Sequence, residues 1–294
     1  MPPWSDIATQ ISASTGIPFV VQKVGRIGGG CISQGHRIES SGQCFFVKIN
    51  SSDNVSMFEA EASGLQEIYN SRALRVPIPV CWGRNDSSSW LVMEFLEMGN
   101  AGRKSAESLG RGLASMHRFS SEKFGWIRDN TIGTTPQFNR LSSDWIQFWR
   151  DHRLGYQLQL AQINGYTGKL QPLGERLMTE LDVFFMDTLI VPSLLHGDLW
   201  SGNYTFDTAG QPVLFDPAIY YGDREADLAM TELFGGFPAN FYAAYRETYP
   251  LDPGYVIRKD LYNLYHVLNH LNLFGEGYLN QAESMMEKLH SEIR

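Results

Sequence analysis

Two short polar segments near residue 200 constrain this chain more than any other feature of its sequence. The first is His196-Gly197-Asp198-Leu199-Trp200-Ser201-Gly202-Asn203, and the second is Phe215-Asp216-Pro217. Each follows an apolar run and contains turn-forming residues, which predicts turns between short strands. An Asp, an Asn five positions later and a second Asp on a neighbouring turn bring together the hard oxygen ligands that Mg²⁺ prefers. A structural turn explains each residue alone, but not the ordered set.

Two features further upstream suit the binding of phosphate. A glycine-rich stretch between two expected strands lets backbone amides approach an anion; it comprises Gly28, Gly29, Gly30, Cys31, Ile32 and Ser33. It is neither a Walker loop nor a Rossmann fingerprint, and a flexible hairpin turn explains it equally well. Lys48 lies in an otherwise apolar strand and needs a partner or solvent. Glu59 and Glu61 on the next helix are both candidate partners, and spacing leaves the choice open; a surface lysine on an edge strand is the alternative.

Composition excludes several classes of function. The chain has 294 residues and a formal net charge of −8, which disfavours nucleic-acid binding because phosphate backbones require a cationic surface. Three cysteines without close spacing indicate neither a disulfide framework nor a zinc site. The first residues lack the pattern of a signal peptide, and no apolar run is long enough to span a membrane. We therefore expect a cytoplasmic globular protein.

The pattern of apolar residues changes after Glu97. Before it, we expect a helix over residues 5–15, five strands (Val20–Ile27, His36–Ser40, Cys44–Ile49, Val76–Trp82 and Trp90–Phe95) and a helix over Asn54–Asn70. After it, we expect helices over Ser105–Phe119, Ser143–Ala161, Pro172–Thr188, Asp223–Leu233, Asn240–Thr248 and Lys259–Phe274. The prediction is an α+β fold with a small five-stranded lobe (residues 1–97) and a mainly helical lobe (residues 98–294).

In this order, the motifs resemble the aminoglycoside phosphotransferase-like branch of the protein-kinase superfamily, and within it the fructosamine kinase (ketosamine 3-kinase) family. The stretches that carry the resemblance are Gly28-Gly29-Gly30-Cys31-Ile32-Ser33, Phe46-Val47-Lys48-Ile49-Asn50, Met57-Phe58-Glu59-Ala60-Glu61, Val92-Met93-Glu94, Leu194 to Asn203, Asp216-Pro217-Ala218, Gly235-Gly236-Phe237-Pro238 and Leu268-Asn269-His270. The resemblance implies a two-lobed kinase-like fold. It also implies ATP-dependent phosphorylation of the 3-hydroxyl of ketosamines, whose 3-phosphate then leaves and regenerates the amine.

The resemblance assigns roles to residues of this chain. The loop from Gly28 to Ser33 covers the phosphates, Lys48 contacts them while Glu61 holds it, and Asp198 orients or deprotonates the sugar hydroxyl. The remaining assignments are a hinge for adenine (Met93, Glu94, Phe95 and Leu96) and two ligands for Mg²⁺ (Asn203 and Asp216). Ser33 replaces the third loop glycine of protein kinases, Pro217 replaces the Phe of Asp-Phe-Gly, and no activation loop is evident.

The sequence also suggests candidate substrate residues and leaves rival functions open. Trp200, two residues beyond Asp198, is expected to form a wall of the sugar pocket, with core packing as the alternative. His266 and His270 have a zinc-like spacing without a following Glu, so pocket lining or a satisfied core histidine is expected instead, and His270 is the candidate for the pocket. The rival functions are a kinase for an aminoglycoside or choline and a catalytically inactive nucleotide-binding scaffold. The intact catalytic set argues against the scaffold.

Cys31 is the basis of a hypothesis of regulation. A thiol among converging loop amides, near Lys48, sits in a positive environment that lowers its pKa. Cys44 and Cys81 are expected to be buried small hydrophobes. The expectation is a monomer with a ketosamine substrate and no nucleic-acid or membrane partner. On oxidation, Cys31 would be capped by a small thiol or would join two subunits, with an inert turn residue as the equally weighted alternative.

Overall fold

A computed structural model describes residues 2–28, 33–186 and 188–293 of the chain. The chain forms two compact units. Unit 1 comprises Met1–Ser105 with Tyr204–Pro217, and unit 2 comprises Ala106–Asn203 with Ala218–Arg294. The α+β class with a small five-stranded lobe and a mainly helical lobe is confirmed.

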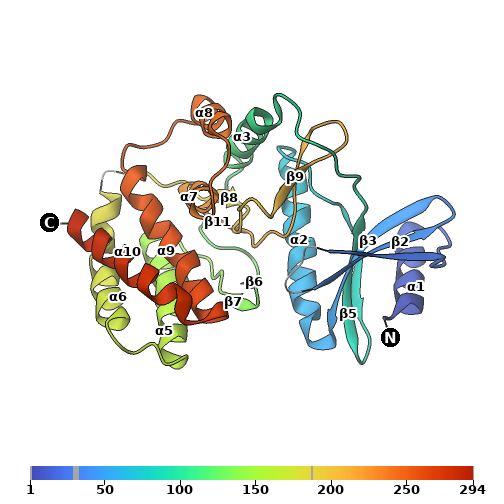
Figure 1. Cartoon of the computed structure of the whole chain (residues 1–294), viewed down its shortest axis with the longest axis horizontal. Coiled ribbons are helices and arrows are strands. Elements are labelled where there is room, and N and C mark those ends of the chain that lie inside the picture. Colours follow the sequence, from blue (N-terminus) through green and yellow to red (C-terminus); the bar gives the residue numbers. More distant parts are fainter. Residues whose placement is uncertain (1, 29–32, 187, 294) are drawn as a thin grey trace. The chain divides into compact units, whose positions relative to one another are not determined.

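Unit 1 is built on an antiparallel sheet with the strand order β1-β2-β3-β5-β4. The strands are β1 (Lys23–Ile27), β2 (Gln34–Ser40), β3 (Gln43–Ser51), β4 (Pro79–Arg84) and β5 (Ser88–Glu94), and the helices are α1 (Trp4–Thr15) and α2 (Val55–Ser71). Both helices flank the sheet in Figure 1. Val47 and Ile49 of β3 belong to the apolar cluster that includes Ile7 and Ile11 of α1. The residue between them, Lys48, faces α2 instead, because successive side chains of a strand alternate.

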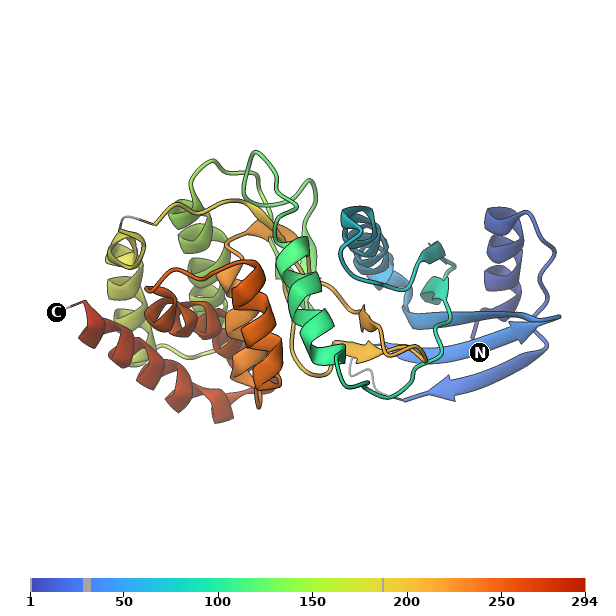
Figure 2. The ribbon, with the colours of Figure 1, turned by 90° about the horizontal axis from the view of Figure 1, so that it is seen from above.

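A hairpin from the middle of the sequence completes unit 1. It is formed by β9 (Tyr204–Phe206) and β10 (Pro212–Leu214). The amide of Gly99 donates to the carbonyl of Phe206 at 2.8 Å, and the amide of Leu214 donates to the carbonyl of Arg75 at 2.9 Å. Figure 2 shows the hairpin, in orange, beside the segment that follows β5. These backbone bonds place Asp216, just after β10, in unit 1 together with the sheet. The boundary expected at residue 97 assigns Asp216 to the helical lobe instead.

Unit 2 is mainly helical around α9 (Tyr255–Phe274), which packs against α5, α7 and α10 (Figure 1). The other helices are α3 (Ser105–Met116), α4 (Trp145–Trp149), α5 (Tyr156–Ile163), α6 (Leu170–Thr179), α7 (Glu225–Leu233), α8 (Ala239–Thr248) and α10 (Leu279–Glu292). Two short strand pairs are β6 (Asn130–Ile132) with β7 (Thr135–Gln137), and β8 (Ser193–Leu195) with β11 (Tyr220–Gly222). In the described part of the chain no helix combines the length and apolarity needed to span a bilayer.

Several expected elements need correction. The first strand begins at Lys23 rather than Val20. The helix expected over Ser143–Ala161 begins at Trp145, because the Asp144 carboxylate accepts the amide of Gln147, and a π-helical turn interrupts it at Arg150–Gly155. The helix expected over Pro172–Thr188 ends at Thr179 and is followed by a 3₁₀ turn, Leu181–Phe185. The helix α10 and the pair β6–β7 were not expected.

Candidate active site

Lys48 of β3 is held between two carboxylates of unit 1. Its Nζ lies 2.5 Å from Oε1 of Glu61 on α2 and 2.6 Å from Oδ1 of Asp216 after β10. The carboxylate that Lys48 contacts on α2 is therefore that of Glu61 and not that of Glu59. The partly buried ammonium of Lys48, a phosphate candidate, thus contacts one carboxylate from the next helix and one, the metal candidate Asp216, from a distant part of the sequence.

The charges of this cluster act on the pKa of Lys48 and on that of Glu61. Burial by itself lowers the pKa of Lys48, but the carboxylates of Glu61 and Asp216 outweigh it and raise the pKa above the ordinary lysine value. Burial raises the pKa of Glu61, against the opposing effect of Lys48. Asp216 is 41% exposed and has a left-handed backbone at φ +57°. This sparsely populated conformation directs an accessible carboxylate beside a fixed cation, as strained residues at functional sites often do.

The segment after β8 forms a loop, which the sequence predicts to be catalytic, and a buried carboxylate holds its backbone. Asp227 of α7 accepts the amide of His196 at 2.7 Å and the amide of Gly197 at 2.8 Å. The carbonyl of His196 accepts the amide of Ala218 at 2.9 Å. Gly197 has φ +81°, and a Cβ there would lie 2.1 Å from the carbonyl oxygen of Ala218. Only glycine fits this position.

Asn203 orients Asp198 within this loop. Its Nδ2 donates to the carbonyl of Asp198 at 2.8 Å and to Oδ2 of the same residue at 3.0 Å. Since both donors of the amide face Asp198, the Oδ1 atom of Asn203 is the one available to a metal. Asp198 and Asn203, which were predicted from their spacing, thus lie together, and the side-chain amide of Asn203 orients the carboxylate of Asp198.

Sequence reasoning missed the roles of Asp227 and His117. In the sequence, Asp227 belongs to an acidic helix start, which the helix dipole alone explains, and His117 has the context of a packing or capping residue. Nε2 of His117 lies 3.1 Å from Oδ2 of Asp227, and Nδ1 lies 2.8 Å from the hydroxyl of Tyr245. Burial lowers the pKa of His117 despite Asp227. Burial tends to raise the pKa of Asp227, but its hydrogen bonds lower it overall. The only sequence signal was a carboxylate inside the apolar helical run Ala226–Met230.

The two predicted substrate residues lie in unit 2. Trp200 is 40% exposed, more than a core side chain, and its ring packs on Gly202. His270 is half-buried, and its Nδ1 lies 2.7 Å from the carbonyl of His266. A carbonyl only accepts, so Nδ1 carries the proton, and burial lowers the pKa of this imidazole. His270 therefore presents Nε2 as an acceptor.

No zinc site accompanies these histidines. Burial lowers the pKa of His266 to about 3, and Nδ1 of His270 is already bonded to the backbone. Within the described ranges, no group of three or more His, Cys, Asp or Glu side chains is placed to hold a metal ion. The rings of Phe234, Phe274 and Tyr278 surround His270 at centroid distances of 4.9–5.3 Å.

The glycine-rich loop is only partly described. Gly29, Gly30, Cys31 and Ile32 lie outside the described residues, so the phosphate-loop and redox predictions for them stay predictions. At the far end of the loop, the hydroxyl of Ser33 accepts Nδ2 of Asn50 at 3.3 Å. The two other cysteines behave differently from each other.

Cys81 is buried as expected, and burial raises its pKa to about 11. The expectation of a buried Cys44 was wrong. This thiol is only half-buried, and its sulfur accepts Nε of Arg37 at 3.1 Å, because β3 presents it toward a neighbouring side chain of β2.

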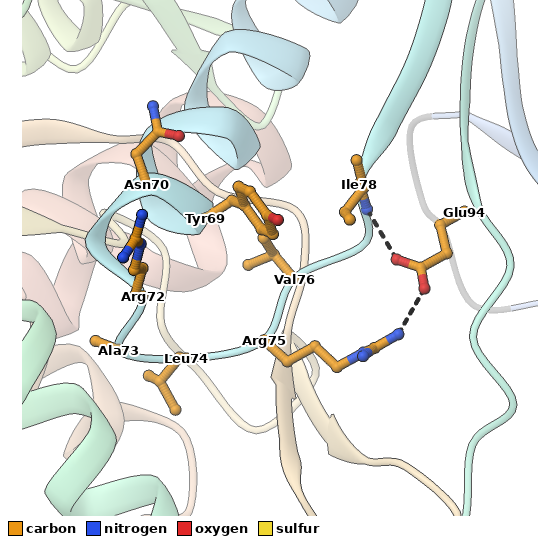
Figure 3. A pocket seen from close by; sticks show the side chains of 9 residues that line it. All are labelled: Tyr69, Asn70, Arg72, Ala73, Leu74, Arg75, Val76, Ile78 and Glu94. Atoms are coloured by element: carbon orange, nitrogen blue, oxygen red, sulfur yellow. Dashed lines mark hydrogen bonds and ion pairs between the residues drawn. The ribbon is translucent and has the colours of Figure 1, made fainter. Parts of the chain in front are cut away.

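The predicted hinge spans the last two residues of β5 and the two that follow it, and its acidic side chain, Glu94, points toward a cavity of about 740 Å³. Glu94 accepts Nη2 of Arg75 at 2.5 Å and the amide of Ile78 at 3.3 Å, as Figure 3 shows. The amide of Glu94 donates to the carbonyl of Ile78 at 2.8 Å, so the backbone donor of this residue is already in use, and its assignment to an adenine hinge stays a prediction. Met93 and Leu96 are buried, and the ring of Phe95 lies under the guanidinium of Arg37.

Comparisons with known proteins agree with this geometry. The sequence profile described as fructosamine kinase matches residues 3–292. The chain belongs to the fructosamine kinase family. A probable ketoamine kinase of Synechocystis is 48% identical over 97% of this chain and 96% of its own length. The chloroplastic protein-ribulosamine 3-kinase of Arabidopsis thaliana is 45% identical over 91% of this chain and 82% of its own length.

Solved structures of other proteins have a fold similar to that of this chain. The crystal structure of a protein described as a fructosamine-3-kinase, from Thermobifida fusca, has a TM-score of 0.85 and 32% identity, with 97% of this chain and 98% of that chain covered. The streptomycin–ATP complex of an aminoglycoside phosphotransferase has a TM-score of 0.64 at 13% identity, covering 98% and 97% of the chains. This second likeness concerns the fold alone. The predicted resemblance to fructosamine kinases, within a fold shared with aminoglycoside phosphotransferases, is confirmed.

Proposed function

We propose that this family member transfers the γ-phosphoryl group of ATP to the 3-hydroxyl of ketosamines, and that loss of the unstable 3-phosphate then regenerates the amine. The observation that carries the proposal is the contact of Lys48 with Glu61 and Asp216 in a member of this family. Such a cluster holds phosphates in kinases, where the lysine is fixed by a helix carboxylate.

The residues of the chain divide the work of this reaction. Asp198, oriented by Asn203, accepts the proton of the sugar hydroxyl or aligns that hydroxyl for attack. Asp227 keeps the loop backbone in place through His196 and Gly197. Lys48 neutralises phosphate charge.

Oxygen donors that fit Mg²⁺ are present. The carboxylate of Asp216 is accessible, and Oδ1 of Asn203 is the amide atom not turned toward Asp198. When bound, Mg²⁺ would draw the phosphate charge away from the leaving oxygen. We assign Asn203 and Asp216 as its ligands.

The substrate is proposed to be a ketosamine formed on a free amine or on a protein lysine. Relatives named as a ketoamine kinase and as protein-ribulosamine 3-kinases support this class. Trp200 offers an exposed ring to cover the sugar, and Nε2 of His270 offers an acceptor for a hydroxyl or ammonium proton. We also propose that the chain acts in the cytoplasm, because the reaction needs a compartment that supplies ATP, and that it acts as a monomer.

A substrate panel tests the proposal. ADP release is measured with ribulosamine, erythrulosamine and fructosamine adducts of lysine, and with choline and an aminoglycoside. ADP release that depends on ketosamines and is lost in Asp198→Asn supports the assignment. Turnover with choline or the aminoglycoside alone would favour the rival kinases, and ATP binding without turnover on any acceptor would favour the scaffold.

A further inference from the structure

Arg153 is a fully buried cation of unit 2 that has no carboxylate partner among the described residues. Its Nη1 donates to the carbonyl of Phe138 at 2.7 Å and to that of His152 at 3.0 Å, and its Nη2 donates to Oδ1 of Asn139 at 2.7 Å. Its Nε is buried without any partner. Neutral oxygens alone therefore hold a charge that is shielded from water.

This arrangement is unusual for a buried arginine. Burying a charge is costly unless the charge is paired, and buried charges are normally paired. Arg258, the comparable buried arginine of unit 2, follows this rule and contacts both Glu225 and Asp252. Arg153 also lies in the π-helical turn Arg150–Gly155, and such turns recur at functional sites.

Aromatic rings take the place of a carboxylate around Arg153. The guanidinium carbon lies 4.0 Å from the ring centre of Tyr220, 4.7 Å from that of Phe148 and 5.8 Å from that of Tyr265. Ring faces attract a cation and leave its positive charge uncancelled. One side chain thereby joins α4, β11, α9 and the end of β7.

The segments that Arg153 joins are those that support the catalytic loop. Tyr220 of β11 pairs with Leu195 of β8, which is the residue directly before the loop. The hydroxyl of Tyr265 donates to Oε1 of Gln137 at 2.8 Å, and Nε2 of Gln137 donates to the carbonyl of Ala218 at 3.0 Å. Ala218 in turn bonds to the loop through its amide. Two separate routes thus connect Arg153 to the backbone around Asp198.

The charge of Arg153 acts on neighbouring side chains with the opposite sign to the carboxylates of Asp198 and Asp227. Burial is the main cause of the raised pKa of Tyr265, while Arg153 lowers this pKa and Asp198 raises it. At His266, burial dominates again, and Arg153 and Asp227 act with opposite signs. The guanidinium of Arg153 is therefore close enough to Tyr265 and His266 to oppose the electrostatic effect of an acid on each of them.

We propose that Arg153 is a positioning residue for phosphotransfer: its buried guanidinium fixes β11, the end of β7 and α9 in the arrangement that orients the loop carrying Asp198. This inference rests on the proposed function for its kinetic test. Small displacements of a reacting group have large kinetic effects, so we expect Arg153→Met to lower kcat about 10- to 100-fold and to leave the KM for ATP nearly unchanged.

The test compares Arg153→Met and Arg153→Lys with the wild type and with Arg150→Met. Arg150 belongs to the same π-helical turn but is partly exposed and contacts Met178 and Asp182, so its removal is the matched control. We expect Arg153→Lys, which keeps the charge but not the planar fork, to fall between Arg153→Met and the wild type in kcat. A folded Arg153→Met with the kcat of the wild type would overturn the proposal. If Arg153→Met does not fold, a kcat of Arg153→Lys equal to that of the wild type would overturn it.

A second readout does not depend on activity. Hydrogen exchange of amides in residues 194–203 and 218–222 is expected to rise in both Arg153 variants and to stay unchanged in Arg150→Met. A wild type that phosphorylates no ketosamine would refute the proposed function, and the exchange data would still decide the role of Arg153. Unchanged exchange in all variants would show that Arg153 does not position the loop.

Discussion

Replacing Asp227 by Asn removes the anion that holds the backbone of the catalytic loop. An amide side chain can accept only through its oxygen, so it leaves the amide of His196 or of Gly197 facing an NH₂ group inside the core. Losing one charge-assisted hydrogen bond and leaving a buried donor unpaired costs about 2–3 kcal/mol. If the activation free energy of phosphotransfer rises by this whole amount, kcat falls about 30- to 150-fold.

The assay is steady-state turnover at saturating ketosamine with ATP varied, together with thermal unfolding. We expect a lower kcat and Tm and an unchanged KM for ATP, because Lys48 and Asp216 belong to unit 1 and keep their contacts. Glu232→Gln is the matched control on α7, since Glu232 contacts Tyr255 and Lys259 rather than the loop. A folded Asp227→Asn enzyme with a kcat within about twofold of the wild type would refute the reasoning, because that ratio corresponds to well under 1 kcal/mol.

Three further predictions concern other groups. Asp216→Ala should weaken the binding of Mg·ATP, measured by titration calorimetry, whereas Asp198→Asn should bind it like the wild type. Trp200→Ala should raise the KM for the ketosamine far more than the KM for ATP; a lower Tm with unchanged KM values would return Trp200 to a structural role. The pKa of His266 is about 3 in the folded chain, below its ordinary value, because burial disfavours the charged imidazole. Its contribution to the free energy of unfolding is therefore fully present above pH 6.5 and decreases on acidification, by about 2 kcal/mol at pH 5. Urea unfolding at pH 7 and pH 5 checks this, and His266→Gln should flatten the dependence.

Spacing along the chain was enough to predict the parts of the site that are local in sequence. Asp198 and Asn203 share one loop, and Lys48 with a helix carboxylate spans a single strand-to-helix connection. Turn residues, a strand lysine and apolar periodicity report such features directly. The two-lobed α+β fold was predicted for the same reason, since its lobes differ in periodicity.

The rest depends on contacts that only the folded chain creates. Asp227 lies 30 residues from Gly197, and nothing in its helical run shows that it faces the loop backbone. Arg153 has an ordinary sequence context, and its burial among rings follows from the packing of α4, β11 and α9. The choice of Glu61 over Glu59 likewise required the orientation of α2. A π-helical turn has no periodicity that sequence analysis recognises.

The central claim is that this chain phosphorylates a ketosamine and thereby releases an amine. It is tested most directly by following a ribulosamine adduct of lysine with ATP and Mg²⁺ by phosphorus NMR and amine analysis, for the wild type and Asp198→Asn. The account predicts a sugar 3-phosphate signal that decays to inorganic phosphate as lysine appears, and neither signal with Asp198→Asn. Consumption of ATP without a sugar phosphate, or equal product from both enzymes, would contradict it.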